Sequence, residues 1–462
     1  MSNETETAAE ATHAPPSENP AFIASVIGAA GDHDAPLLRR MLIALTPPDL
    51  ADVIEHVPLE TALTVARMIG RDLPVEFLAE LSWERREEIL PELPATYVGK
   101  ALGELDTDDA AAVAADIDQK QLGHVLAAAD EDTRLAVEEA LSFDEETAGR
   151  LMQREYVAAP EGANVGNVID RLRAAAAELP DEFFEIYVVD AAMRPIGAVR
   201  VSSLIRSRRE TTLTSIMRSP LILIRPEMDQ EEVAQTFQKY HMASAPVVDE
   251  AGRLTGMVTV DDIVDVISEE SEEDLLRLAG VNEAAQTDSV YRSVRARAPW
   301  LLVNLGTAVV ASSVIRLFEG SIAQLVALAV LMPIVASLGG NAGTQALAVA
   351  VRAIAARDLT EGNAPRYVLR ETMTAVSNGF IFAILLAIVV QFWFHDTLLA
   401  VAIALAVVIT FAMGGLAGIL VPLTLRRFGA DPAVSSSVFV TFTTDIVGFL
   451  AFLGLATMIV LR

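Results

Sequence analysis

Five long apolar stretches in the C-terminal third of the chain restrict its fold more than any other feature. We place them at residues 299–318, 322–352, 372–394, 398–423 and 434–461. A helix needs roughly 20 apolar residues to cross a hydrocarbon core about 30 Å thick, and each stretch is long enough. Because backbone groups in lipid must be hydrogen-bonded within the segment, the sequence predicts a five-helix, all-α transmembrane domain at 299–462.

One carboxylate lies inside the last of these stretches. Asp445 occurs in the run FVTFTTDIVGF, where a charge costs roughly 2.5–3.5 kcal/mol at the helix centre on insertion scales. Acids in such positions usually face an interior cavity and mark an ion path. The alternative role is a hydrogen bond to a Ser or Thr of a neighbouring helix. We take Asp445 as the leading candidate to contact a permeating ion.

The second apolar stretch contains the irregular segment PIVASLGGNAGTQ at 333–345. Pro333 lacks a backbone donor and the glycines loosen a helix, so we expect a break there that lines a cavity. Counted from the inner ends of their spans, Asn341 and Asp445 fall in one layer. Close helix packing is the alternative role for Asn341 and the glycines. The predicted all-oxygen site, suited to Mg²⁺, Ca²⁺ or Mn²⁺, consists of Asp445, Asn341, Thr441, Gly339 and Gly340.

Charge is distributed very unevenly along the chain. Of the net charge of −29, about −33 lies before residue 290 and +4 after it. An acidic half of this kind argues against a nucleic-acid partner and favours cations, although a merely solvated surface is the alternative. The chain has no cysteine, which excludes thiolate metal sites but not hard cations with oxygen ligands. The polar first 20 residues predict a disordered tail and no signal peptide.

Residues 21–152 predict an acidic, α-helical, solenoid-like domain. Short amphipathic segments such as LTPPDLADVIEHVPLETALTVARMI are separated by Pro or Asp. Asp or Thr before the apolar-periodic runs is typical of a helix N-cap. Stacking of successive short helices on one core is the architecture that such a pattern favours.

Residues 153–273 contain a tandem repeat of strand, turn, strand and helix. One copy reads EIYVVDAAMRPIGAVRVSSLI and the other SAPVVDEAGRLTGMVTVDDIV. These copies resemble a pair of CBS domains, at 153–212 and 213–273, which are α/β modules that bind adenine nucleotides or cations. In the second copy, Thr259 and Asp262 match the nucleotide motif: the hydroxyl would meet a phosphate and the carboxylate the ribose. ATP or another adenine nucleotide is therefore a candidate ligand, and a plain helix N-cap is the alternative.

Acidic residues cluster around a linker helix that we expect at 274–298, between the second CBS domain and the membrane. Like charges packed together repel, and a bridging cation would draw the domains into one compact state that is coupled to the pore. A solvated acidic face is the alternative. The candidate cation ligands of this regulatory region are Asp109, Asp262, Asp265, Glu269, Glu270, Glu273 and Asp274; Asp108 lies beside them.

Arginine positions predict the orientation in the membrane. By the positive-inside rule, the N-terminal half is cytosolic and the short C-terminus is outside the cell. This places the chain in an inner cell membrane as a multi-pass protein. The arginines that face the cytosol in this topology are Arg292, Arg295, Arg297, Arg352, Arg357, Arg366, Arg370, Arg426 and Arg427.

The order of these modules resembles the MgtE family of magnesium transporters and channels over nearly the whole chain. The motifs are PIVASLGGNAGTQ, PWLLVNL at Pro299 and the stretch from Asp431 to Gly448. The resemblance implies a homodimeric, Mg²⁺-selective channel that closes when cytosolic Mg²⁺ fills acidic sites between the helical and CBS domains. It also implies that Asp445 is the pore aspartate, with Asp431 as a further candidate ligand.

Two other functions compete with this interpretation. The same architecture could transport Mn²⁺, Co²⁺ or Ca²⁺, or act as a non-transporting membrane sensor that signals through its CBS pair. An acid inside the membrane argues against the sensor. The sequence has neither a GxxxxGK[ST] motif nor a nucleophile–base constellation, so we do not expect an enzyme.

Overall fold

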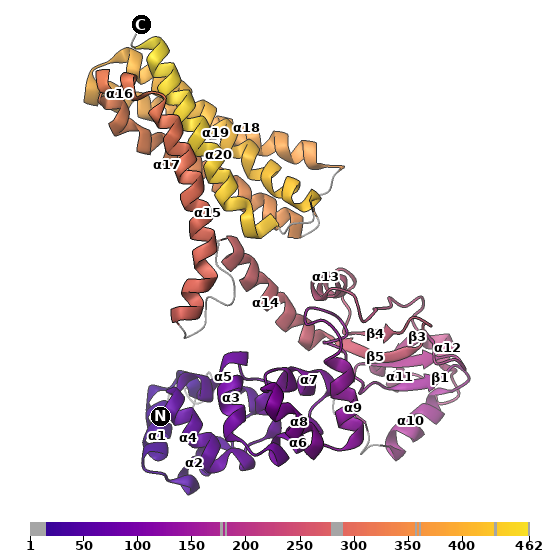
Figure 1. The fold of residues 1–462 in the computed structure, drawn as a ribbon. Helices are drawn as coiled ribbons and strands as arrows, with labels where there is room; N and C mark the ends of the chain where they lie inside the picture. Colours follow the sequence, from indigo (N-terminus) through magenta and orange to yellow (C-terminus); the bar gives the residue numbers. More distant parts are fainter. Residues whose placement is uncertain are drawn as a thin grey trace, which may run out of the picture. The chain divides into compact units, whose positions relative to one another are not determined.

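The computed structural model describes residues 15–175, 179–180, 183–278, 290–355, 358–359, 362–428 and 432–460. The chain divides into two compact units, Met1–Ser268 and Glu269–Arg462. Figure 1 shows both, and each is considered by itself.

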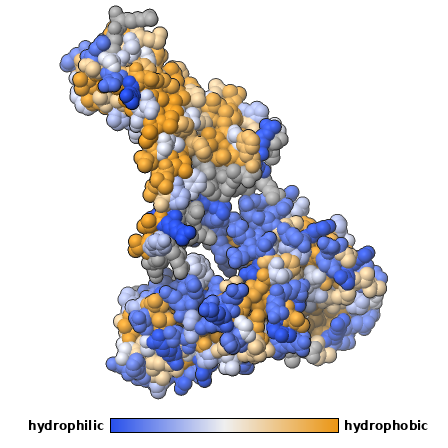
Figure 2. Space-filling view, in the orientation of Figure 1, coloured by the Kyte–Doolittle hydropathy of each residue, from blue (hydrophilic) through white to orange (hydrophobic). Residues whose placement is uncertain are grey.

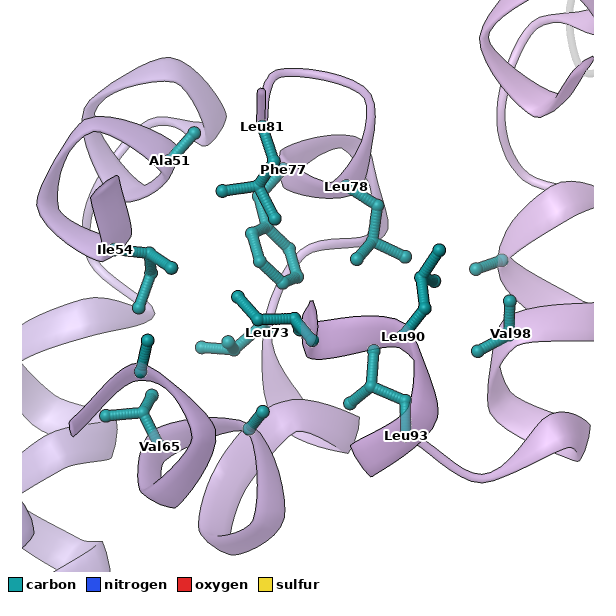
Figure 3. Packing of buried hydrophobic residues seen from close by; sticks show 14 of the residues in the cluster. Ala51, Ile54, Val65, Leu73, Phe77, Leu78, Leu81, Leu90, Leu93 and Val98 are labelled. Atoms are coloured by element: carbon teal, nitrogen blue, oxygen red, sulfur yellow. The ribbon is translucent and has the colours of Figure 1, made fainter. Parts of the chain in front are cut away.

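The first unit begins with a domain of short helices that share one core. Asp34, Thr46 and Asp130 cap three of these helices by accepting a backbone N–H, as the sequence predicts. Figure 3 shows Phe77 in the middle of the core, between Ile54 and Leu90. The helices are α1 (Pro20–Gly31), α2 (Ala35–Leu42), α3 (Pro47–His56), α4 (Leu59–Ile69), α5 (Trp83–Ile89), α6 (Ala95–Leu102), α7 (Thr107–Ala115), α8 (Gln119–Ala128) and α9 (Glu131–Ala140), with one-turn helices η1 (Pro16–Glu18), η2 (Gly70–Asp72), η3 (Val75–Leu78) and η4 (Leu90–Glu92).

The tandem repeat follows within the same unit. Strand β2 pairs with β1 in parallel and with β3 antiparallel, and β4 pairs antiparallel with β5. Both hairpins carry a register shift at the same place, before Val189 and before Val248. The expected pair of α/β copies is therefore confirmed. Its elements are β1 (Ala158–Pro160), α10 (Val165–Ala174), β2 (Glu185–Val189), β3 (Pro195–Arg200), α11 (Val201–Arg206), α12 (Leu213–Ile216), α13 (Gln230–Tyr240), β4 (Ser244–Val248), β5 (Leu254–Thr259) and α14 (Val260–Leu278).

The second unit is helical. Its helices are α15 (Val290–Arg316), α16 (Glu319–Gln324), α17 (Ala327–Ala355), α18 (Ala364–Phe394), α19 (Thr397–Arg427) and α20 (Pro432–Ile459). Among the described residues, 5 helices are long and apolar enough to cross a membrane, which confirms the predicted five-helix domain. The surface of this unit is mostly hydrophobic, whereas that of the first unit is mostly hydrophilic (Figure 2).

Two expected boundaries fall inside continuous helices. The helix α14 runs through residue 273, and α15 joins residues 290–298 to the first apolar stretch. Residues 279–289 of the expected linker lie outside the described residues. The domain limits that we drew from the sequence at 273 and 298 therefore remain predictions.

The break that we expected in the second apolar stretch is not at the glycines. Helix α17 is continuous from Ala327 to Ala355 and contains Pro333. The interruption comes earlier, at Leu325 and Val326, between α16 and α17. Pro333 lies within the first two turns of α17, and side chains of neighbouring helices fill the space at Gly339 and Gly343. The prediction of a broken helix at 333–343 was therefore wrong.

Candidate ion path and cation site

Glycines bring α17 and α19 into backbone contact. A Cβ atom on Gly339 would lie 2.2 Å from Cγ2 of Thr410, and one on Gly418 would lie 2.7 Å from the carbonyl oxygen of Gly343. A Cβ atom on Gly414 would lie 3.1 Å from the carbonyl oxygen of Gly339. Both helices thus present a GxxxG pattern, the spacing that allows membrane helices to approach most closely. Gly339 therefore has the packing role that we gave as its alternative.

Helix α20 packs antiparallel to α17. A Cβ atom on Gly343 would lie 2.6 Å from Cγ1 of Val440, and one on Gly339 would lie 3.5 Å from Cβ of Thr444. This register places Asp445 level with residue 338, and Asn341 level with residue 442. At 1.5 Å of rise per residue, the two are offset by about 4.5 Å along the helix axes. Asp445 and Asn341 are thus about one helical turn apart rather than in one layer.

A polar stripe runs along the uncovered face of α17. Ser337, Asn341 and Gln345 follow one another at a spacing of four residues, and all three are exposed among the described residues. Gly340 lies beside them in open space, and its carbonyl accepts a hydrogen bond from the Thr344 hydroxyl at 2.8 Å. Because α17 is a continuous helix, the carbonyls of Gly339 and Gly340 belong to its regular hydrogen bonding rather than to an opened turn.

Helix α20 carries a shorter stripe of the same kind. Thr441 and Asp445 are four residues apart, hence on one helix face, and both are half-buried. Within the described residues, no group of three or more His, Cys, Asp or Glu could hold a metal ion. One chain therefore offers this region a single carboxylate and several neutral oxygens.

A second acidic region lies inside the first unit, where α7 meets the beginning of α14. Burial, and then the charges of Asp262 and Asp109, raise the pKa of Asp108 well above its ordinary value. Asp108 is only 7% exposed, and its Oδ1 accepts no hydrogen bond from the described residues. A buried, unpartnered carboxylate oxygen that faces further acids is a position suited to a cation.

The neighbours of Asp108 are shifted in the same direction. Burial raises the pKa of Asp109 to about 6, with smaller contributions from Asp106 and Glu80, whereas the Arg86 guanidinium acts to lower it. Burial also raises the pKa of Asp262 to about 7. The Thr259 hydrogen bond opposes this shift, while Asp261 and Asp109 add to it. The interface acids, as we call this set, are Glu80, Asp108, Asp109, Asp261, Asp262 and Asp265.

Two of the predicted ligands, Asp109 and Asp262, are thus brought within electrostatic range of each other. Asp265 is more exposed, and burial and Asp261 raise its pKa. Sequence reasoning missed Glu80, whose pKa is raised by burial and by Asp265. No pattern in its segment, LPVEFLAELSWERREE, sets Glu80 apart from the other acids there.

A three-residue strap, Gln153–Glu155, connects α7 to β5, the strand that leads directly into α14. The backbone of Gln153 exchanges two hydrogen bonds of 2.8 Å with that of Met257 on β5. The Glu155 carboxylate accepts from the Thr107 hydroxyl at 2.7 Å and from the Thr107 N–H at 3.2 Å. Asp106, at the N-cap of α7, makes no side-chain capping bond. Glu155 therefore caps α7 at Thr107, the residue directly before Asp108.

The remaining predicted residues have other surroundings. Thr259 donates to Oδ2 of Asp262 at 2.6 Å, so the two candidate nucleotide ligands bond to each other. Glu269, Glu270 and Glu273 lie on α14 within the second unit, and Glu273 pairs with Arg277. Two predictions lie outside what the structure describes: the side chain of Asp274 and the whole of Asp431.

Comparison with known proteins decides the family. Residues 332–455 match the MgtE model, described as a divalent cation transporter, 45–146 match the MgtE intracellular N domain, and 213–269 match a CBS domain. The magnesium transporter MgtE of Thermus thermophilus is 34% identical over 436 residues, which cover 92% of this chain and 96% of that protein. This chain belongs to the MgtE family.

The chain is also similar to other known proteins. The magnesium transporter MgtE of Bacillus subtilis is 29% identical over 420 residues, covering 91% of this chain and 93% of that protein. A crystal structure of the cytosolic domain of the Mg²⁺ channel MgtE in complex with ATP is 34% identical, with a TM-score of 0.49, and covers 53% of this chain and 99% of that one. As an MgtE protein, this chain is a multi-pass membrane protein with an N-terminal soluble half.

Proposed function

We propose that this MgtE protein conducts Mg²⁺ across the membrane along a path lined by α17 and α20. The observation that carries the proposal is Asp445: a carboxylate halfway along a membrane helix, on the same face as Thr441. Asn341 supplies an amide oxygen about one turn away. Oxygen ligands of this kind suit Mg²⁺, which keeps several waters and takes one or two carboxylates.

We propose further that two copies complete the path. A single carboxylate does not balance the charge of a divalent ion. The polar stripe of α17 would also cost free energy if it faced lipid. A two-fold axis beside α17 would cover both stripes and bring a second Asp445 into the path. By the positive-inside rule, we propose that the acidic half lies in the cytosol and the C-terminus outside an inner membrane.

The interface acids form the proposed regulatory site for cytosolic Mg²⁺. Burial, and then the charges of neighbouring acids, raise the pKa values of Asp108, Asp109 and Asp262, so their ionised forms are disfavoured when the helical domain and the second CBS domain pack together. A divalent cation would remove that repulsion and so favour the packed state, in which the channel closes. The acids Glu269, Glu270, Glu273 and Asp274 follow the interface acids in the sequence of α14 and are proposed as further cation ligands.

An adenine nucleotide such as ATP remains a proposed ligand of the second CBS domain. Thr259 and Asp262 stand at the end of β5 and in the first turn of α14, where a nucleotide phosphate and ribose would meet them. Because Asp262 also belongs to the interface acids, nucleotide and cation would compete for it. Calorimetric titration of ATP with and without Mg²⁺ tests this competition.

Flux into liposomes tests the transport proposal. The purified full chain should carry Mg²⁺ down an inside-negative potential, and Asp445→Asn should reduce this flux by at least about a hundredfold, since the path loses its charge. Glu371→Gln, which neutralises a half-buried acid of α18, is the matched control and should keep most of the flux. Near-normal flux in a folded Asp445→Asn protein would exclude the assignment. Mn²⁺, Co²⁺ and Ca²⁺ in the same assay define the selectivity.

A further inference from the structure

The ends of three membrane helices meet in a small apolar cluster. Ile354 of α17, Tyr367 of α18 and Ile419 of α19 pack there around the buried side chain of Leu359. The end of α17, the beginning of α18 and the end of α19 are therefore at one side of the transmembrane unit.

Five arginines lie on the helix ends that form this cluster, and all are exposed. Within the part of the chain that the structure describes, the nearby acids are Asp358 and Glu371, and the carboxylate of Glu371 lies 3.0 Å from Arg370. Positive charge is therefore in excess at this side of the unit. The members of this group, the arginine collar, are Arg352, Arg366, Arg370, Arg426 and Arg427.

Two members of the collar are already held in place. The guanidinium of Arg370 lies 4.7 Å from the centre of the Tyr367 ring, and Arg426 donates to the carbonyl of Leu359 at 3.3 Å. A guanidinium offers several donors in a fixed fork that fits a phosphate. Because these two side chains are pre-oriented, less conformational entropy is lost when an anion binds.

The uncovered face of α18 continues from charge into apolar surface. Arg366 and Arg370 share this face, at helical spacing, with the exposed side chains of Leu369, Met373 and Phe380. A cationic end above an apolar stripe matches an anionic phospholipid, with its phosphate at the arginines and its acyl chains along the helix. A soluble phosphate or an acidic protein segment would leave that stripe uncovered.

We infer that the arginine collar binds the headgroup phosphate of anionic phospholipids, with the acyl chains along the exposed face of α18. The inference does not depend on the ion path, because it uses only the membrane location of these helices. The opposite side of the unit provides a control: Arg316 is exposed at the end of α15, shortly before α17 begins.

Native mass spectrometry of the full chain in detergent micelles tests the inference with phosphatidylglycerol and phosphatidylcholine at equal concentration. The wild-type protein should retain phosphatidylglycerol preferentially. The variant Arg352→Gln/Arg366→Gln/Arg427→Gln should lose this preference by about fivefold for each arginine removed. Arg316→Gln should behave as wild type. If the triple variant does not purify as a folded protein, Arg366→Gln alone, combined with a salt titration, keeps the test open, because exposed charge interactions weaken with ionic strength.

Several outcomes would overturn the inference. These are no preference in the wild type, full preference in the folded triple variant, or an equal loss in Arg316→Gln. Displacement of phosphatidylglycerol by millimolar inorganic phosphate at matched ionic strength would identify a free-phosphate site instead. A triple variant that changes protease protection of residues 1–268 but not lipid retention would identify the acidic half of the chain as the partner.

Discussion

The two candidate cation regions of this protein differ in how complete they are within one chain. The interface acids of the first unit gather where α7 meets α14, and burial, followed by neighbouring negative charge, raises the pKa of Glu80, Asp108, Asp109, Asp262 and Asp265. Among the described residues, the candidate ion path has one carboxylate, Asp445, on a half-buried face of α20, beside an exposed polar face of α17. In our proposal, the first region lies within one chain, whereas the second is completed by a second copy of the protein.

The two regions also use different forces to bring their elements together. In the first unit, hydrogen bonds of the strap Gln153–Glu155 hold β5 and α7 against electrostatic repulsion. In the membrane unit, Gly339 and Gly418 allow backbones to touch, and contact rather than charge holds the helices. Substitutions in the two regions should therefore act independently. Removing charge should favour packing in the first unit, whereas adding bulk should weaken packing in the membrane unit.

The largest expected effect is on the interface acids. Asp108→Asn/Asp262→Asn removes two of the repelling charges while it keeps side-chain shape. The packed state of the cytosolic half should then form without Mg²⁺, and its Mg²⁺-dependent protection from protease should decrease at least about tenfold, since the cation has less repulsion to relieve. Limited proteolysis across a Mg²⁺ titration measures this, with Glu138→Gln on the exposed face of α9 as the control. A variant as Mg²⁺-dependent as the wild type would refute the site.

The glycine contact provides the next test, confined to the membrane unit. Gly418→Ala places a Cβ atom 2.7 Å from a backbone oxygen of α17, so the helices must separate, at a cost of about 1–3 kcal/mol. Gly340→Ala meets nothing within 4 Å and should be neutral or stabilising by up to about 1 kcal/mol, since alanine favours helix. Thermal unfolding of the two purified variants should shift in opposite directions. Equal shifts would contradict the close packing.

The pH dependence of the metal-free protein should distinguish the regions further. Because packing raises the pKa of Asp109 to about 6 and that of Asp262 to about 7, the packed state binds more protons than the separated state between about pH 4 and 7. Its stability therefore falls as pH rises through this window. The groups that face these two acids are Glu80, Asp106, Asp108, Asp261 and Arg86.

Proteolysis in chelator at pH 5.5 and pH 8 measures this dependence. The cytosolic half should be better protected at the lower pH, and saturating Mg²⁺ should reduce the difference. Equal cleavage at both pH values in chelator would show that these carboxylates do not repel one another in the packed state.

The smallest expected effect concerns the strap. Glu155→Gln keeps the size of the side chain but weakens the cap on α7, at a cost of about 1 kcal/mol. The Mg²⁺ midpoint for protection should rise by about fivefold, because the acids of α7 are held less firmly. Glu161→Gln, an exposed acid farther along the chain, is the matched control. An unchanged midpoint would mean that the strap does not position α7.

Periodicity and composition were sufficient to predict the three architectures. Capping residues such as Thr46 and Asp130 predicted the short helices. The repeated strand pattern predicted the tandem α/β copies, and the long apolar stretches predicted the membrane helices. Pro333 and the glycines led us to predict a break in the second membrane helix that the structure does not have, because their effect depends on neighbouring side chains that the sequence does not reveal. Thr410 of α19 fills the space beside Gly339, and this packing supports a continuous α17 at that point.

The cation region was predicted only in part, for a similar reason. The sequence shows that Asp109 and Asp262 lie among other acids, but it does not show how deeply their side chains are buried. The burial of Asp108 and the approach of Glu80 depend on how α7 packs against the end of β5, which no local pattern encodes. The position of Asn341 relative to Asp445 likewise depends on the register between α17 and α20. Counting residues from the predicted ends of the two spans placed Asn341 in the same layer as Asp445, whereas the two are about one turn apart.

Helix α14 has a mechanical consequence. It starts at the interface acids, and its 19 residues form one uninterrupted helix across the division between the two units. At 1.5 Å per residue, it is a stiff arm about 28 Å long. A tilt of about 10° in its first turn would swing its far end by about 5 Å, roughly the height of one helical turn. Under the proposed regulation, a small adjustment among a few carboxylates would in this way be amplified along α14.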